Sequence, residues 1–227
     1  MVLLGGGEAS RQDVAECLNL GERVVAVDGG LALAAAAGIV PDAVIGDFDS
    51  LAPDALSAIP PDRRHRIEEQ DSTDFEKALS RVAAPVVIGA GFLGGRIDHQ
   101  LAALHTLLAL AHQPCVLLGA REILLLAPPR IALGTVAGET VSLFPLAEVT
   151  GQSSGLQWEI DGLRFAPGAR IGTSNRATGP VTLQMAEPGM VLILPRRLIR
   201  PVVAALSQED AARWPARAAA RKDPPPR

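Results

Sequence analysis

The sequence has 227 residues, of which 48% are hydrophobic and 20% are charged, and its formal net charge is −4. This composition is typical of folded globular proteins and excludes an intrinsically disordered chain. The acidic balance and an aromatic content of only 3% argue against binding nucleic acid through surface charge or base stacking. We therefore expect a small-molecule partner.

The apolar segments are too short to cross a membrane, since none approaches the roughly 20 residues that span a bilayer. The apolar start at residues 1–4 has no basic flank and meets three glycines, which favours a first strand over a signal peptide. Cys17 and Cys115 have no C-x-x-C spacing, so we interpret both as reduced core residues. A cytoplasmic location is expected.

The first half of the sequence repeats a short apolar run, then small or acidic residues, then a helical pattern. The predicted strands are residues 1–4, 24–27, 44–45, 86–88, 116–118 and 123–126. The predicted helices begin after Gly30, near Pro53, at Asp74 and at Asp98, which we expect to cap a helix running to about residue 111. Strands that alternate with helices pair in parallel, so the sequence predicts an α/β fold.

After Pro128 and Pro129 the pattern changes to short apolar runs separated by Gly, Pro, Ser and Asn. The predicted strands there are residues 141–144, 181–185 and 191–194. This pattern is typical of a small antiparallel β domain. We divide the chain into an α/β domain, a β domain and an Arg- and Pro-rich tail that ends in disorder, over residues 1–127, 128–206 and 207–227.

Acidic residues gather directly after the predicted strands, where an open parallel sheet binds its ligand. Asp28 follows one strand, and Asp47 and Asp49 follow the next. Asp71 and Asp74 lie at the start of a predicted helix. Carboxylate oxygens suit Mg²⁺, which completes its ligand shell with water and substrate phosphates. Asp47 and Asp49, only two positions apart, therefore predict a nucleotide–metal site.

Several of these residues also have a purely structural interpretation. A capping-box pattern surrounds Asp74, which taken alone favours a role in starting the helix. Asp49 can cap a helix or form an Asx turn, and Asp98 can be a cap only. Asp47 is the residue that such local roles explain least well.

Glycine-rich loops follow two of the predicted strands, at residues 29–30 and 91–95. Glycine lets backbone N–H groups approach a phosphate closely. Arg96, directly after Gly94 and Gly95, can hold two phosphate oxygens with its guanidinium. Lys77 can add a point charge, although a helical lysine is more often a solvated surface residue.

A dinucleotide-binding fingerprint is the rival interpretation of the first residues. Gly5, Gly7 and Ser10 loosely imitate that fingerprint, and Asp28 ends the next strand where a ribose-binding acid lies. An NAD(P)-dependent oxidoreductase is therefore an alternative. Ser10 in place of the last glycine weakens this alternative, which also leaves Asp47 without a role.

The order of the motifs resembles the thiamine pyrophosphokinase (thiamine diphosphokinase) family. The four motifs in the first half are Asp28-Gly29-Gly30, Gly46-Asp47-Phe48-Asp49-Ser50, Gln70-Asp71-Ser72-Thr73-Asp74-Phe75-Glu76-Lys77 and Gly94-Gly95-Arg96-Ile97-Asp98-His99. Three segments of the second half are similar to later motifs of that family, in the same order: Ser142-Leu143-Phe144-Pro145-Leu146, Gly155-Leu156-Gln157-Trp158 and Thr173-Ser174-Asn175.

The resemblance implies a nucleotide-binding α/β domain, a C-terminal β-sandwich and a homodimer. It also implies Mg²⁺-dependent transfer of the pyrophosphoryl group of ATP to the hydroxyl of thiamine, a kinase reaction that gives thiamine diphosphate and AMP. By this resemblance the expected metal-binding and catalytic carboxylates are Asp47, Asp49, Asp71 and Asp74. The expected nucleotide-binding residues are Asp28, Gly29, Gly30, Lys77, Gly94, Gly95, Arg96 and Asp98.

The same resemblance places four residues beside thiamine: Gln70, Trp158, Ser174 and Asn175. A lone tryptophan such as Trp158 is more often a core residue, but its motif favours a wall of the thiamine pocket. We expect each pocket to be shared between the two chains of the dimer. A module that binds thiamine or a nucleotide without catalysis remains an alternative.

Overall fold

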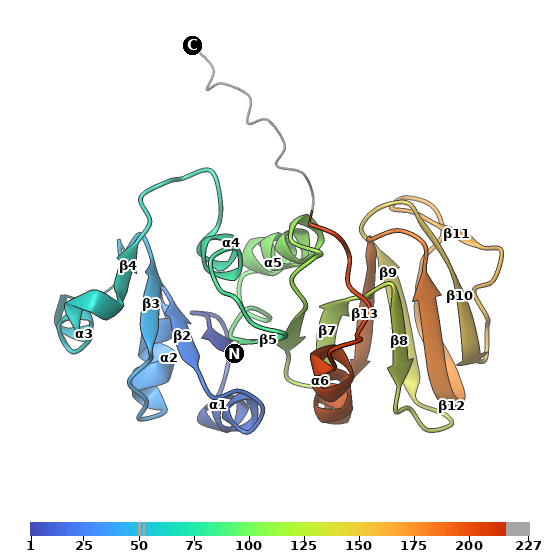
Figure 1. Cartoon of the computed structure of the whole chain (residues 1–227), viewed down its shortest axis with the longest axis horizontal. Coiled ribbons are helices and arrows are strands. Elements are labelled where there is room, and N and C mark those ends of the chain that lie inside the picture. Colours follow the sequence, from blue (N-terminus) through green and yellow to red (C-terminus); the bar gives the residue numbers. More distant parts are fainter. Residues whose placement is uncertain (50, 52, 217–227) are drawn as a thin grey trace, which may run out of the picture.

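The computed structural model describes residues 1–49, 51 and 53–216 (Figure 1). The first half contains β1 (Val2–Leu4), α1 (Arg11–Leu18), β2 (Val24–Val27), α2 (Gly30–Ala36), β3 (Ala43–Gly46), α3 (Pro53–Ser57), η1 (Pro61–Arg63), β4 (Arg64–Arg66), α4 (Asp74–Leu79), β5 (Val87–Ala90), α5 (Ile97–Ala109) and β6 (Cys115–Leu118). The first half ends with β7 (Glu122–Leu126), and the second half contains β8 (Arg130–Leu133), β9 (Thr140–Pro145), β10 (Val149–Leu156), β11 (Arg164–Phe165), β12 (Gly172–Met185), β13 (Met190–Pro195), η2 (Arg196–Leu198) and α6 (Ile199–Ser207). In this described part, no helix is long and apolar enough to cross a bilayer.

Six strands of the first half pair in parallel, in the order β4, β3, β2, β1, β5 and β6. Val2 and Leu4 of β1 pack on the side of α1 and α2, whereas Leu3 packs with Phe75 of α4 and Leu107 of α5. Because helices cover both faces, these strands are almost wholly apolar, except for the edge strand β4. The predicted α/β fold is confirmed, and the carboxyl ends of the parallel strands lie at one edge.

The sheet continues from β6 into antiparallel strands without a break (Figure 1). β13 lies between β7 and β9, followed by β12, β10 and β11, while β8 pairs with the second part of β12. Over the described residues, thirteen strands thus form one mixed sheet. The proposed domain boundary at residues 127–128 falls between β7 and β8. The sheet is continuous across this boundary because β13 pairs with β7 on one side and with β9 on the other.

The starts of α1 and α5 show different kinds of cap. α1 begins after Ser10, whose hydroxyl accepts a hydrogen bond from the backbone N–H of Asp13 at 3.2 Å, so Ser10 acts as a helix cap. The prediction that Asp98 caps α5 is wrong, because the cap position is Arg96 and Asp98 lies in the first turn. There Asp98 forms an ion pair with Arg96, with 2.6 Å between the carboxylate Oδ2 and the guanidinium nitrogen.

A partly buried ion cluster joins the first helix to the end of β13. The guanidinium of Arg196 lies 2.6 Å from Glu16 Oε2 and also binds Asp13, both on α1. It donates a further hydrogen bond to the carbonyl of Gly119, which follows β6, at 3.0 Å. Residues more than 180 positions apart in sequence are thereby held together.

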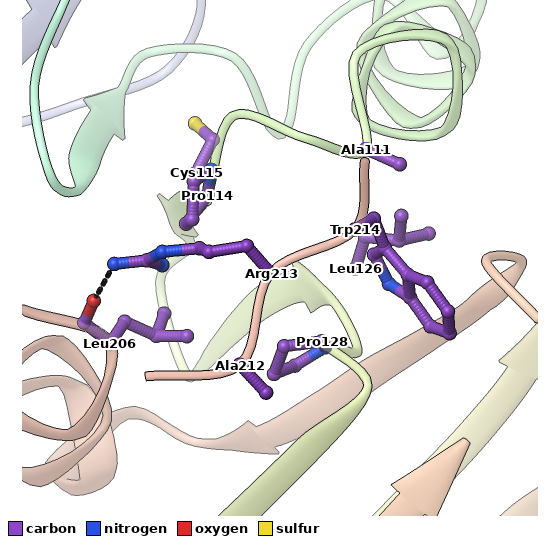
Figure 2. Close-up of a pocket in the computed structure, with 9 residues that line it drawn as sticks. All are labelled: Ala111, Pro114, Cys115, Leu126, Pro128, Leu206, Ala212, Arg213 and Trp214. Carbon is purple, nitrogen blue, oxygen red and sulfur yellow. Dashed lines mark hydrogen bonds between the residues drawn. The ribbon is translucent and has the colours of Figure 1, made fainter. Parts of the chain in front are cut away.

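The segment after α6 packs against the link between the two halves. The indole N–H of Trp214 donates to the carbonyl of Ala127 at 2.8 Å, and Arg213 donates to the carbonyl of Leu206. Figure 2 shows both side chains among the residues that line a cavity of about 10 Å³, which has room for a water molecule only. Residues 211–214 of the predicted tail are therefore partly buried, and residues 217–227 lie outside the described part.

Both cysteines are free and buried, as predicted. Burial raises the pKa of the Cys17 thiol to about 12. Burial also raises the pKa of Cys115. The thiolate is the reactive form of cysteine, so neither residue is a candidate nucleophile.

Candidate active site

A cleft of about 690 Å³ opens at the carboxyl edge of the parallel strands. Its walls come from residues 5–8 after β1, Asp28 and Gly29 after β2, Asp47 after β3, and several residues of 91–96 after β5. The loop and first turns of α4 close one side. An open parallel sheet binds its ligands at this edge, so the cleft is the candidate active site.

The turn between β2 and α2 requires glycine at Gly30. A Cβ atom built on Gly30 would lie 1.7 Å from the carbonyl oxygen of Leu4, so the turn packs directly on the end of β1. Asp28, just before it, adopts a φ of 41°, a conformation that non-glycine residues rarely take. This turn aims Asp28 into the cleft, where Gly29 also lies, while Gly30 is not among the lining residues.

Three carboxylates meet in the cleft. Asp28, Asp47 and Asp74 each offer one oxygen, and these oxygens all lie within 4.8 Å of one another. Asp28 is buried and the other two are half-buried. Three hard oxygen donors at this spacing fit a divalent cation such as Mg²⁺.

The structure places the other two expected metal ligands differently. Asp49 is exposed, and its backbone N–H donates to Asp47 Oδ1 at 3.1 Å. The local turn therefore uses the Asp47 carboxylate as its acceptor, although the turn role was expected for Asp49. Asp71 is exposed and does not line the cleft, and its backbone N–H donates to Glu69 at 3.2 Å.

Lys77 lies inside this acidic cluster. Its side chain is only 2% exposed, so the interpretation as a solvated surface residue is wrong. The ammonium Nζ lies 3.1 Å from Asp74 Oδ1 and 3.7 Å from Asp47 Oδ2. Asp74 and Lys77 are three positions apart on α4, so one face of that helix presents both charges.

The charges of the cluster depend on these contacts. Burial raises the pKa of Asp74, and the ammonium of Lys77 opposes that effect. Burial alone would lower the pKa of Lys77, but the hydrogen bond to Asp74 and the nearby carboxylates raise it overall. The backbone N–H of Asp49 lowers the pKa of Asp47. Asp47 and Lys77 are therefore both charged at neutral pH.

The start of α4 confirms the predicted cap and supports the site as well. The Thr73 hydroxyl accepts a hydrogen bond from the backbone N–H of Glu76 at 3.2 Å. Gln70, in the loop before the helix, lines the cleft, and its amide Nε2 lies 3.5 Å from Asp47 Oδ2. This segment therefore both caps a helix and lines the cleft.

The second glycine loop also lines the cleft. Gly94 and Gly95 have φ values of +79° and +68°, which favour glycine, and the N–H of Gly94 donates to the Gln100 side chain at 3.1 Å. Arg96 lines the cleft, with its exposed side chain paired to Asp98. The loop thus brings a guanidinium to the mouth of the cleft.

Sequence reasoning missed several residues of the cleft. Residues 5–7 and Glu8 line it, although the glycine run was considered only for the rival fingerprint. Phe92 also lines it, with its ring centroid 4.3 Å from that of Phe75. Arg66 does not line the cleft, but it donates a hydrogen bond to the backbone carbonyl of Asp47 at 3.1 Å. The run of glycines at residues 5–7 could have indicated a place in the cleft, whereas no sequence pattern indicated the positions of Phe92 and Arg66.

The three expected thiamine contacts of the second half lie together but do not line the cleft. The buried side chain of Asn175 accepts from the N–H of Trp158 at 3.2 Å and donates to its carbonyl at 2.7 Å. Trp158 is 57% exposed, which excludes the core interpretation. Ser174 has a φ of 62° and donates its backbone N–H to Ser142 at 2.9 Å.

Comparison with protein families assigns both halves of the chain. Residues 14–118 match the thiamin pyrophosphokinase catalytic domain, and residues 130–188 match the thiamin pyrophosphokinase vitamin B1 binding domain. Together these matches cover well over half of the sequence. The chain belongs to the thiamin pyrophosphokinase family. The first match contains the carboxylate cluster, and the second contains Trp158, Ser174 and Asn175.

Individual members of the thiamin pyrophosphokinase family show the same likeness. Thiamine pyrophosphokinase 2 of Oryza sativa subsp. japonica is 28% identical over 155 residues, which are 60% of this chain and 58% of that protein. The chain thus matches less than two thirds of the length of such curated relatives. The crystal structure of thiamin pyrophosphokinase from Geobacillus thermodenitrificans is 25% identical, with a TM-score of 0.71 over 86% of this chain and 97% of that one. Yeast thiamin pyrophosphokinase, 15% identical, has the same fold, with a TM-score of 0.71 over 87% of each chain.

Proposed function

We propose that the chain is an ATP:thiamine diphosphotransferase, which moves the pyrophosphoryl group of ATP to the hydroxyl of thiamine and releases AMP. The observation that carries the proposal is the cluster of Asp28, Asp47 and Asp74, whose oxygens lie within 4.8 Å of one another in a cleft of the catalytic domain. Transfer of a charged phosphoryl group needs positioning and charge stabilisation above all. The cleft offers both signs of charge for that purpose.

Magnesium fits the donor set of this cluster. Asp28, Asp47 and Asp74 would hold the ion, with Asp49 beside them. When bound, Mg²⁺ neutralises charge on the phosphate oxygens that it contacts. These residues would leave part of the ligand shell to water and phosphate oxygens, as is usual for nucleotide sites.

The nucleotide and the thiamine ring require different groups. We assign the phosphates to the backbone of Gly29, Gly94 and Gly95 and to the guanidinium of Arg96, which can bind two oxygens at once. Gln70 lies next to Asp47 and can orient thiamine through its amide. The acidic surroundings also favour the cationic thiazolium ring of thiamine.

We further propose that the active site is shared in a homodimer. Trp158 and Ser174 are exposed in the vitamin B1 binding domain and do not line the cleft of their own chain. An exposed indole offers a face on which a flat cation can stack. We place these two residues over the cleft of the partner chain, with the antiparallel half acting as a thiamine-binding β-sandwich.

The first test is the reaction itself. Enzyme, Mg²⁺, ATP and thiamine are expected to give thiamine diphosphate and AMP in equal amounts, measured by chromatography, with no product when thiamine is omitted. Formation of ADP and thiamine monophosphate would contradict pyrophosphoryl transfer. Binding of both ligands without product would favour the non-catalytic module, and hydride transfer with NAD(P)H would favour the oxidoreductase.

The shared site predicts complementation between two defective subunits. Trp158→Ala should weaken thiamine binding more than ATP binding, because the indole contributes roughly 0.5 to 2 kcal/mol of cation–π attraction. Mixing this variant with Asp47→Asn should restore activity, since a mixed dimer has one site with both groups intact. If mixed dimers are isolated by two affinity tags and stay inactive, each site lies within one chain.

A further inference from the structure

Lys77 is a resident cation in the proposed metal site. Among the described residues, it is the charged one with the lowest exposure, at 2%. It belongs to α4, whose turn is fixed by the hydrogen bond from its own backbone N–H to the Thr73 carbonyl at 2.8 Å and by the buried side chains of Phe75 and Leu79. The lysine side chain is therefore built into the fold and has little freedom to move away.

The carboxylates that would bind a metal already have donors. The Lys77 ammonium contacts Asp74 Oδ1 at 3.1 Å and lies 3.7 Å from Asp47 Oδ2. Asp47 Oδ2 also faces the amide of Gln70 at 3.5 Å, and Asp47 Oδ1 accepts from the Asp49 backbone at 3.1 Å. A divalent cation that enters alone must therefore compete with these hydrogen bonds and share two carboxylates with an ammonium group.

We propose that Lys77 makes metal binding depend on the nucleotide. Two cations on the same carboxylates repel each other, and water screens them weakly in a buried cluster. The negative charge of a polyphosphate offsets the combined positive charge of the metal and the Lys77 ammonium. The divalent cation therefore binds well as part of the metal–nucleotide complex and poorly alone. This inference rests on the proposed function, because it takes the cluster as the metal site.

The test measures metal binding without nucleotide and without turnover. Mn²⁺ serves as the probe for Mg²⁺, and free Mn²⁺ is followed by electron paramagnetic resonance as it is titrated into enzyme at pH 7. Lys77→Met keeps the length and apolar stem of the side chain and removes the charge, so we expect Mn²⁺ to bind at least tenfold tighter than to the wild type. Lys77→Arg keeps the charge and should show no such gain.

Two further variants decide what a gain means. Asp74→Asn combined with Lys77→Met should lose the gain, because the new affinity must come from this cluster. Lys77→Gln also removes the charge but retains a hydrogen-bond donor. It should show the same gain in Mn²⁺ affinity and replaces the methionine variant if circular dichroism shows that the latter does not fold. Unchanged or weaker Mn²⁺ binding by the folded neutral variants would overturn the inference.

The outcome is separable from that of the proposed function. A wild type that makes thiamine diphosphate, together with neutral variants that gain no Mn²⁺ affinity, overturns the role of Lys77 only. A wild type that makes no thiamine diphosphate, together with a clear gain of Mn²⁺ affinity in the variants, overturns the proposed reaction. That result still supports Lys77 as the cation that weakens metal binding to the cluster.

Discussion

Asp47→Asn is expected to lower the turnover of thiamine diphosphate formation by roughly 10³-fold, the scale of losing one group that stabilises transition-state charge. Asparagine keeps the size of the side chain, and its carbonyl oxygen can still accept the N–H of Asp49, so the turn survives. What disappears is the charge that faces Lys77 and one of three carboxylates that meet in the cleft. Turnover and thermal unfolding of the purified variant provide the measurement.

Asp62→Asn is a matched control, since Asp62 is an exposed aspartate of η1 outside the cleft. Its turnover should stay within twofold of the wild type. The interpretation of Asp47 would fail if both Asp47→Asn and Asp49→Asn kept full activity, because the carboxylate would then serve only the local turn.

Gly30→Ala is expected to destabilise the protein by about 4 kcal/mol or more, the upper range for a single substitution. The added Cβ would lie 1.7 Å from the Leu4 carbonyl oxygen, and that oxygen belongs to a strand paired on both sides. Neither the strand nor the helix start can shift without breaking other contacts. Urea denaturation of the purified variant measures the free energy of unfolding, and loss of soluble protein is the extreme outcome.

The neighbouring glycine is the control for this prediction. A Cβ on Gly29 would meet Gly6 at 3.4 Å, an ordinary contact, and the φ of −52° suits alanine. Gly29→Ala should therefore change the free energy of unfolding by less than about 1 kcal/mol. Equal stability of both variants would show that the turn can move away from β1.

The strands of the fold were predictable wherever they are buried on both faces. β2, β5 and β6 are continuous apolar runs, and all three lie close to their expected positions. β4 was missed because it is the edge strand Arg64–Arg66, whose charges give no apolar signal. β10 was missed because its exposed face consists of threonine, serine and glutamine.

The site was predictable as a set of residue types and only partly as a geometry. The motifs identified Asp28, Asp47 and Asp74, which the fold brings together. The burial of Lys77 depends on how α4 packs on β3, and no local pattern records that packing. The exposure of Trp158 likewise depends on Asn175, a residue 17 positions away that fixes its backbone.

The position of β13 has a consequence for how the chain is made. β13 is the last strand of the described sequence, yet it lies between β7 and β9 and pairs with both. During translation β7 and β9 therefore each keep an unpaired edge until residues 190–195 leave the ribosome, and the two halves of the sheet cannot join before then. Pairing over such long sequence separations slows folding, and open edges invite association between nascent chains. Because β13 is translated last, the edges of its two neighbouring strands stay unpaired until it is made.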